Sequence, residues 1–171
     1  MFRAMEILSK VKLNCTLVFC ASRDEETTGT GARTLPYTVN PDMAIAIDVT
    51  HGKTPGVGEP DAFEMDEISI IYGANAHPKL NEMIENSADE ANIKLAIEVC
   101  MGRSGTDGWG IQVLRGGIPT AILSVPVRYM HTTVETLSTD TINELARLIA
   151  QFAMDISDIG DKWEEKLCLD D

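Results

Sequence analysis

The sequence is poor in basic residues, with 14 Lys and Arg against 27 Asp and Glu and a formal net charge of -13. Nucleic acids and anionic membrane surfaces are bound through a positively charged face. The composition therefore predicts neither nucleic acid nor membrane as a partner. Much of the acidic excess lies in residues 155–171, DISDIGDKWEEKLCLDD, which we expect to form a solvated acidic tail after a helix.

Long apolar runs are also missing. No stretch reaches the roughly 18 apolar residues of a membrane helix, and the opening MFRAMEILSKVKL lacks the apolar core of a signal peptide. The sequence contains no CxxC zinc motif, and most cysteines stand in apolar runs, so we expect buried, reduced thiols at Cys15, Cys20, Cys100 and Cys168. These absences predict a cytoplasmic protein.

The length of 171 residues suits one domain, which at this size needs no disulfide or metal to hold a core. Apolar, β-branched segments predict strands at residues 15–21, 43–50, 67–73 and 93–99. Residues 111–132 are expected to form a short helix, a Gly-Gly turn and a final strand. Helical spacing predicts helices near 2–11 and 32–37, another after Pro78, and a closing helix capped by Ser138 or Thr139.

Two of these helices have clear apolar faces. They are Leu80, Met83, Ile84, Ala88 and Ala91 in the first, and Ile142, Leu145, Leu148, Ile149 and Phe152 in the second. Strands that alternate with helices predict an α/β fold with a mostly parallel sheet sandwiched between helices. We expect one domain over residues 1–171.

Polar residues follow several of the predicted strands. In an open α/β sheet, ligands bind beyond the carboxyl ends of the strands. Carboxylate oxygen and neutral imidazole suit zinc, manganese or cobalt, so a hydrolytic metal site is predicted at this rim. The residues concerned are Glu25 and Glu26, Asp48 with His51, Thr106 with Asp107, and Arg128 with His131.

The neighbouring glutamates have a geometric interpretation. In an extended segment successive side chains point in opposite directions, so one glutamate can ligate a metal while the other acts as a base. A metal lowers the pKa of bound water from about 15.7 to about 7, which leaves the base a single proton to move.

Each residue also has a plainer explanation. Paired glutamates commonly belong to a solvated loop. Asp48 could equally cap the next turn, Asp107 has the composition of an ordinary turn, and His131 could be a packed, hydrogen-bonded residue. For His51 and His77, in Gly- or Pro-containing loops, a surface position is favoured.

Four segments, taken in order, carry a resemblance: EETTGTGA, PDMAIAIDVTHG, SGTDGWGIQ and IPTAILSVPVRYMHT. Together they resemble the glutamyl/deblocking aminopeptidase family of dinuclear metallopeptidases, the tetrahedral aminopeptidase type, some members of which are labelled endoglucanase. The similarity runs from near residue 1 to about residue 153. It implies peptide substrates, a homo-oligomer and two divalent metal ions, zinc or cobalt.

The resemblance also implies roles for single residues. Glu25 would be the general base, Glu26 and His131 would hold one metal, and Asp48 would hold the other. Gly105, Thr106 and Asp107 would line the substrate pocket.

The family has two further ligands, a histidine and a bridging aspartate, and an inserted β-rich domain, all upstream of the segment that resembles MFRAMEIL. We therefore expect an N-terminally truncated, zinc-peptidase-like fold, the C-terminal catalytic portion of the enzyme, with three of five ligand positions. A missing strand is expected to leave a sheet edge or a core face uncovered.

Three functions follow from these observations. The first is a metal-dependent aminopeptidase, impaired unless the missing ligands are supplied. The second is an inactive remnant or a non-catalytic interaction subunit on the same scaffold. The third and weakest is a glycoside hydrolase that uses paired carboxylates, because such an enzyme has no need of the His131 segment.

Overall fold

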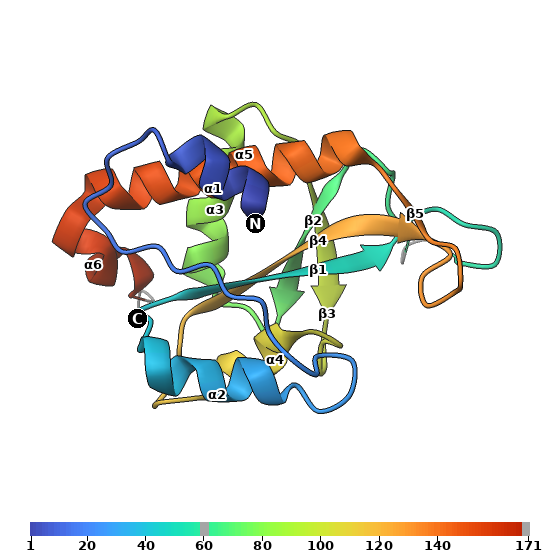
Figure 1. Cartoon of the computed structure of the whole chain (residues 1–171), viewed down its shortest axis with the longest axis horizontal. Coiled ribbons are helices and arrows are strands. Elements are labelled where there is room, and N and C mark those ends of the chain that lie inside the picture. The colour runs from blue at the N-terminus through green and yellow to red at the C-terminus, as the bar shows by residue number, and fades with distance from the viewer. Residues whose placement is uncertain (59–61, 169–171) are drawn as a thin grey trace.

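The computed structural model describes residues 1–58 and 62–168, and it shows one sheet between two groups of helices. Helices α1, α3 and α5 lie on one side of the sheet, and α2 and α4 lie on the other (Figure 1). The helices are α1 (Phe2–Leu8), α2 (Thr30–Val39), α3 (Pro78–Glu90), α4 (Asp107–Ile111), α5 (Thr139–Ile159), the 3-10 turn η1 (Gly160–Lys162) and α6 (Trp163–Leu167). The strands are β1 (Ala44–His51), β2 (Ile68–Gly73), β3 (Leu95–Cys100), β4 (Thr120–Arg128) and β5 (Thr136–Leu137). No helix among the described residues is long and apolar enough to cross a membrane.

The sheet has the strand order β1-β4-β2-β3, with β5 paired to β4. β1 runs parallel to β4 and β2 runs parallel to β3, whereas β2 and β4 are antiparallel through Ser69↔Ser124 and Ile70↔Leu123. The predicted α/β class is confirmed, with an antiparallel pair at its centre. Because of that pair, β1 and β4 end on one side of the sheet while β2 and β3 end on the other.

The main core lies between the sheet and helices α1, α3 and α5. Its fully buried members include Ile70 and Leu123 from the sheet, Leu80 and Ile84 from α3, and Leu148 from α5. The helical spacing predicted this face well. Ile142 is the exception, since it is 40% exposed at the first turn of α5.

The long helix α5 begins at an N-cap serine, one of the two caps expected. The Ser138 hydroxyl accepts a hydrogen bond from the Thr141 backbone N–H at 3.3 Å. Replacing an N-cap serine with alanine usually costs about 1 kcal/mol.

We expect Ser138→Ala to lower the free energy of unfolding by about 1 kcal/mol, because the Thr141 N–H loses its acceptor. Ser138→Asp is the matched control, since its carboxylate can accept the same bond and suits a helix N-terminus. Thermal unfolding followed by circular dichroism measures both. Equal losses in the two variants would contradict the cap.

Residues 15–21 were expected to form a strand, and this prediction is wrong. The segment has no ladder partner among the described residues, and Leu17 and Val18 are exposed. Apolar, β-branched composition indicates that a segment can form a strand, but the strand also needs a neighbour to accept its backbone hydrogen bonds.

The chain near α4 also differs from expectation. Residues 107–111 form this helix inside the segment expected to be a loop, and residues 112–117 are turns rather than the predicted short helix. The end of the chain is more ordered than a solvated tail: Leu167 of α6 is buried against the core. Residues 169–171 of that predicted tail lie outside the described residues.

The four cysteine thiols were expected to be buried, and this prediction is wrong. Cys15, Cys20 and Cys100 are half-buried and Cys168 is exposed, and all four are free.

Candidate active site

A row of polar side chains crosses the sheet on the face that carries α2 and α4. Asp48 on β1 is the register partner of Ser124 on β4, which pairs with Ser69 on β2. The Ser69 hydroxyl donates to the Glu98 carboxylate of β3 at 2.7 Å. The Ser124 hydroxyl is buried and makes no hydrogen bond within the described structure. Four strands therefore contribute to a polar strip in the middle of the sheet.

The glutamate pair stands on a tight turn rather than on the extended segment that the sequence suggested. The carbonyl of Asp24 accepts hydrogen bonds from the backbone N–H groups of Thr27, Thr28 and Gly29 at 3.3, 3.0 and 2.8 Å. The expected geometric division between Glu25 and Glu26, which assumed opposite directions along a strand, is therefore wrong. Their separate roles stay a prediction.

A glycine of α2 packs against the start of this turn. The Gly31 N–H donates to the Arg23 carbonyl at 3.0 Å, and a Cβ at Gly31 would lie 2.2 Å from the Arg23 nitrogen. Only glycine permits this approach, so it sets the position of the glutamate turn relative to α2.

The histidine follows β4 on a second strained turn. Both Tyr129 and His131 have positive φ. The backbone carbonyl of Tyr129 accepts two hydrogen bonds from Thr132, one from its backbone N–H at 3.1 Å and one from the Thr132 hydroxyl at 2.6 Å. The backbone N–H of His131 donates a hydrogen bond to the Glu135 carboxylate at 2.6 Å. The Nε2 atom of the His131 ring lies 3.5 Å from a Glu26 carboxylate oxygen. The turn thus brings the imidazole to the glutamate pair.

Asp107 is the first residue of α4 and not a simple turn residue. One of its oxygens accepts a hydrogen bond from the Ser22 hydroxyl, and the other is buried without a partner within the described structure. Helix α4 sits close to the sheet because Gly108 has no side chain: a Cβ there would lie 2.5 Å from Ile122.

A small hollow of about 40 Å³ lies beside Glu25. Residues from the glutamate turn, α2 and the segment before α4 line it, among them Gly105, Thr106 and Asp107. Arg33 and Arg103 also line it.

The carboxylates repel one another. The pKa of Glu25 is raised, first by partial burial and then by Asp48, Asp107 and Glu26, while His131 opposes the shift. The pKa of Asp48 is raised by burial and by Asp107, Glu26 and Glu98, although a hydrogen bond from the Val49 N–H at 2.8 Å partly stabilises its anion. The site therefore holds excess negative charge in the folded chain.

Because the pKa of Asp48 is raised in the folded chain, ionisation of this carboxyl group lowers the free energy of unfolding. This loss of stability is absent below the ordinary pKa of 3.8 and complete above the raised pKa. We expect Asp48→Asn to raise the unfolding midpoint by a few degrees at pH 7 in the presence of a chelator. The difference should vanish as the pH approaches 3.8. Asp42→Asn, at an exposed carboxylate just before β1, is the control and should change little. A lower midpoint for Asp48→Asn at pH 7 would contradict the repulsion.

The structure brings together most of the residues predicted for the site. Glu25, Glu26, Asp48, Asp107 and His131 come from four separate segments and interact electrostatically. By contrast, His51 and Arg128 are exposed at the ends of their strands, and His77 is half-buried as the N-cap of α3. The surface position favoured for His51 is confirmed, and the one favoured for His77 is not.

Several neighbours of the site were not predicted: Ser22, Arg33, Glu98, Arg103, Ser124 and Glu135. Glu98 alone carried a signal in the sequence, as a charged residue inside an apolar strand. The others become visible only when segments distant in sequence meet.

The side chains of the candidate site are of the kinds that bind a divalent cation, but they do not form a complete set of ligands. Carboxylate oxygens and an imidazole nitrogen are suitable ligands, and the uncompensated charge at Glu25 and Asp48 favours a cation. Within residues 1–58 and 62–168, however, no three His, Cys, Asp or Glu side chains are arranged to hold one ion. The described residues therefore fit part of a metal centre rather than a complete one.

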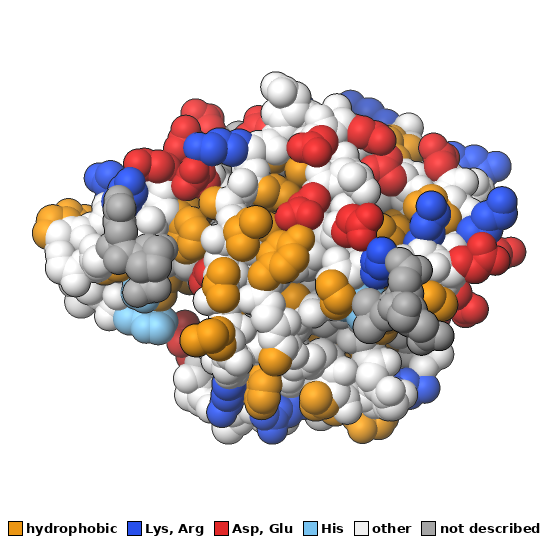
Figure 2. Space-filling model, turned by 180° about the vertical axis from the view of Figure 1, so that it is seen from behind, with side chains coloured by type: hydrophobic (Ala, Val, Ile, Leu, Met, Phe, Trp, Pro, Cys, Tyr) orange, Lys and Arg blue, Asp and Glu red, His pale blue; other side chains and the backbone are white. Residues whose placement is uncertain are grey.

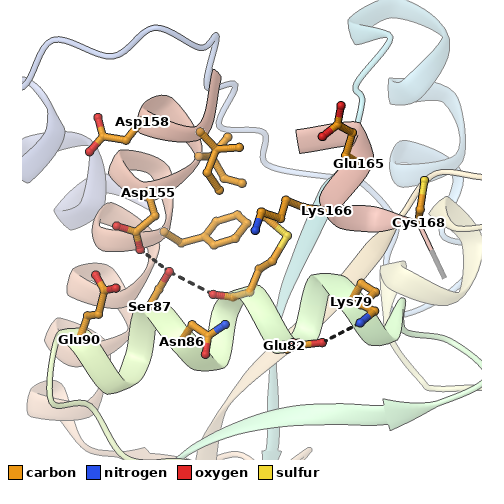
Figure 3. Close-up of a pocket in the computed structure, with 14 residues that line it drawn as sticks. Lys79, Glu82, Asn86, Ser87, Glu90, Asp155, Asp158, Glu165, Lys166 and Cys168 are labelled. Carbon is orange, nitrogen blue, oxygen red and sulfur yellow. Dashed lines mark hydrogen bonds and ion pairs between the residues drawn. The ribbon is translucent and has the colours of Figure 1, made fainter. Parts of the chain in front are cut away.

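A larger hollow lies away from these residues. It has a volume of about 570 Å³ between α3, α5 and α6 (Figure 3). Ser87 and Asp155 are hydrogen-bonded at its side, and Lys79 pairs with Glu82 at 3.3 Å. None of the predicted site residues lines it.

Comparison with known proteins identifies relatives of the chain. It is 34% identical over 157 residues to a candidate aminopeptidase of Acetivibrio thermocellus, covering 87% of this chain and 46% of that protein. It is 33% identical to the lysyl aminopeptidase of Pyrococcus furiosus, covering 75% of this chain and 37% of the relative. The chain thus spans less than half the length of these relatives.

Solved structures share the fold. The TET aminopeptidase from a Thaumarchaeota archaeon superposes with a TM-score of 0.84 at 24% identity, covering 97% of this chain and 47% of that one. An aminopeptidase from Desulfurococcus kamchatkensis gives a TM-score of 0.71 at 29% identity, covering 79% and 40%. The profile of the M42 glutamyl aminopeptidase family matches residues 1–148, and the chain belongs to this family.

Proposed function

We propose that this chain supplies the carboxyl-terminal part of the hydrolytic centre of a metal-dependent aminopeptidase. The observation that supports the proposal most is the position of Glu25. It lies in the electrostatic field of its neighbour Glu26 and of Asp48, Asp107 and His131, which come from three other segments of the fold. Family membership makes peptide hydrolysis the chemistry to expect at such a site.

Glu26 and His131 would hold one divalent cation, zinc or cobalt, and Asp48 would hold a second. A bound cation supplies Lewis acidity, which makes water acidic enough to lose a proton near pH 7. Glu25 would accept that proton and return it to the leaving amine. Its raised pKa suits this exchange, since a proton shuttle works best near the working pH. Each cation would need further ligands beyond those described here.

The hollow beside Glu25 suggests which substrates would fit. Arg33 and Arg103 line it, and within the described residues neither guanidinium forms an ion pair. In a chain with a net charge of -13, these two arginines supply positive charge at the hollow. Arginine binds carboxylates through paired hydrogen bonds, so the site would favour peptides with an acidic N-terminal residue.

The experiment compares the chain alone with a fusion that places the amino-terminal part of the Pyrococcus furiosus relative before it. Hydrolysis of glutamyl, lysyl and leucyl anilides is followed with added zinc or cobalt and with a chelator. We expect the fusion to be active, to prefer the glutamyl substrate and to lose activity with the chelator. A folded fusion that binds metal but hydrolyses none of the three substrates contradicts the proposal.

The alternatives make different predictions in the same experiment. A non-catalytic subunit would give a folded, inactive fusion. A glycoside hydrolase would cleave a soluble cellulose derivative and would not depend on His131. Activity on anilides that is lost in His131→Ala would exclude both.

A further inference from the structure

The hydroxyl of Ser124 is a buried polar group that the proposed mechanism does not use. Acidic and basic side chains lie on the outside of the molecule in Figure 2, where water can pair with them. Ser124 is only 1% exposed, and its hydroxyl makes no hydrogen bond within the described structure. An unpaired buried hydroxyl destabilises the folded state and is rare in native proteins. A group of this kind inside a candidate site points to a role other than stability.

The strand register identifies the side chains beside this hydroxyl. Ser124 lies between Asp48 on β1 and Ser69 on β2, and all three face the side of the sheet that carries α2 and α4. Along β4, the same face carries Ile122 and Pro126, whose side chains contain no acceptor. Asp48 and Ser69 are therefore the neighbouring side chains of the sheet that could accept a hydrogen bond from Ser124.

Asp48 is the stronger acceptor of the two. The Ser69 hydroxyl already donates its one hydrogen to Glu98 at 2.7 Å, so it can only offer Ser124 a neutral oxygen. A hydrogen bond to a carboxylate is roughly twice as strong as one between neutral groups. Because a hydroxyl rotates freely, Ser124 will donate to Asp48 whenever a carboxylate oxygen comes within reach.

In the structure, the Asp48 carboxylate is turned toward its own backbone. Its Oδ1 accepts a hydrogen bond from the Val49 N–H at 2.8 Å, and Ser124 is left unpaired. Burial, and then neighbouring carboxylates, raise the pKa of Asp48, so its anion is held unfavourably. With this charge offset by a cation, the carboxylate can turn away from the Val49 N–H, and an oxygen that does so can accept from Ser124.

We propose that Ser124 is a positioning residue for Asp48, and that its hydroxyl donates to the Asp48 carboxylate when this carboxylate holds a divalent cation. Carboxylates that bind metals are normally fixed by such a second contact, and its loss weakens metal binding about 10- to 100-fold. The hydroxyl is thus unpaired without the cation and paired with it. The inference rests on the ligand role proposed for Asp48 and adds the partner that fixes this ligand.

The two states of the hydroxyl give Ser124→Ala opposite effects on stability and on zinc binding. In a chelator, the substitution removes an unpaired buried hydroxyl, so we expect the unfolding midpoint of the chain to rise by about 2–4 °C. In the fusion, it removes the donor to Asp48, so we expect the zinc dissociation constant to increase about 10- to 100-fold. Ser124→Thr keeps the hydroxyl and should bind zinc like the wild type.

Ser157→Ala is the matched control. Ser157 is 5% exposed on α5, on the other side of the sheet, and its hydroxyl accepts a hydrogen bond from the Asn14 N–H at 2.7 Å. Because this hydroxyl is already paired in the folded chain, its removal should lower the unfolding midpoint. It should leave the zinc dissociation constant of the fusion unchanged.

Thermal unfolding followed by circular dichroism and calorimetric titration with zinc measure the two effects. A lower unfolding midpoint for Ser124→Ala in the chelator overturns the inference, because the hydroxyl would then already be paired. Equal zinc dissociation constants for Ser124→Ala and the wild type overturn it as well.

Asp48→Asn in the same titration separates this inference from the proposed function. If Asp48→Asn weakens zinc binding and Ser124→Ala does not, the ligand role of Asp48 stands and the inference alone fails. If the fusion binds no zinc, or if Asp48→Asn leaves its zinc binding unchanged, the ligand role of Asp48 fails and the inference fails with it.

Discussion

Glu25→Gln is expected to lower turnover of the active fusion about 1000-fold while cation binding stays close to the wild-type value. Proton transfer by a positioned side chain contributes roughly 10²–10⁴ in rate. Glutamine has the size of glutamate but cannot accept the proton from water, so the chemical step loses its base. Because Glu25 is not a proposed ligand, calorimetric titration with zinc should change little.

The neighbouring residue provides the matched control. Glu26 lies 3.5 Å from the His131 Nε2 and is the proposed ligand of the pair. We expect Glu26→Gln to weaken cation binding, because an amide oxygen is a poorer ligand than a carboxylate, and to lose activity that added metal partly restores. Activity of Glu25→Gln should show no such restoration.

The two variants therefore separate the base from the ligand. If Glu25→Gln weakened zinc binding as much as Glu26→Gln, the roles assigned to the pair would be wrong. If neither substitution changed turnover, the proposed centre would be elsewhere in the complete protein.

The sequence predicted much of the fold because it contains strong local signals. β1, β2 and β3 are short apolar segments bounded by turn residues, and α3 and α5 have regular apolar faces. Segment 15–21 has equally strong strand character, yet its backbone has no strand beside it in the described structure. Strand formation depends on pairing, which local composition does not specify.

The site was predictable to the extent that its residues follow strands or stand in compact motifs. Glu25, Asp48 and His131 were singled out in this way, although Asp48 lies within β1 and residues 15–21 before Glu25 form no strand. The antiparallel pairing of β2 with β4 was not predicted, and it places Glu98 in the same polar strip as Asp48. The place of the buried Ser124 hydroxyl in this strip could not be predicted either. It depends on the strand register that pairs Ser124 with Asp48.

Gly31→Ala is expected to cost about 3 kcal/mol of unfolding free energy, within the range for substitutions that overpack a close contact. A Cβ at this position would lie 2.2 Å from the Arg23 nitrogen and 2.7 Å from the Arg23 carbonyl oxygen, both backbone atoms. Neither can move away without breaking the hydrogen bond from the Gly31 N–H. At about 2–4 °C per kcal/mol for a domain of this size, the unfolding midpoint should fall by roughly 6–12 °C.

The same substitution should also disturb the site, because the turn that carries Glu25 and Glu26 begins at Arg23. We expect the fusion bearing Gly31→Ala to lose activity even at temperatures where it is folded. Gly102→Ala is the control, since Gly102 has ordinary φ and no atom within 4 Å of an added Cβ. It should leave both the unfolding midpoint and activity unchanged. A stable, active Gly31→Ala variant would mean that the turn is not held against α2 in this way, and that the glutamates are positioned by contacts other than the Gly31–Arg23 approach.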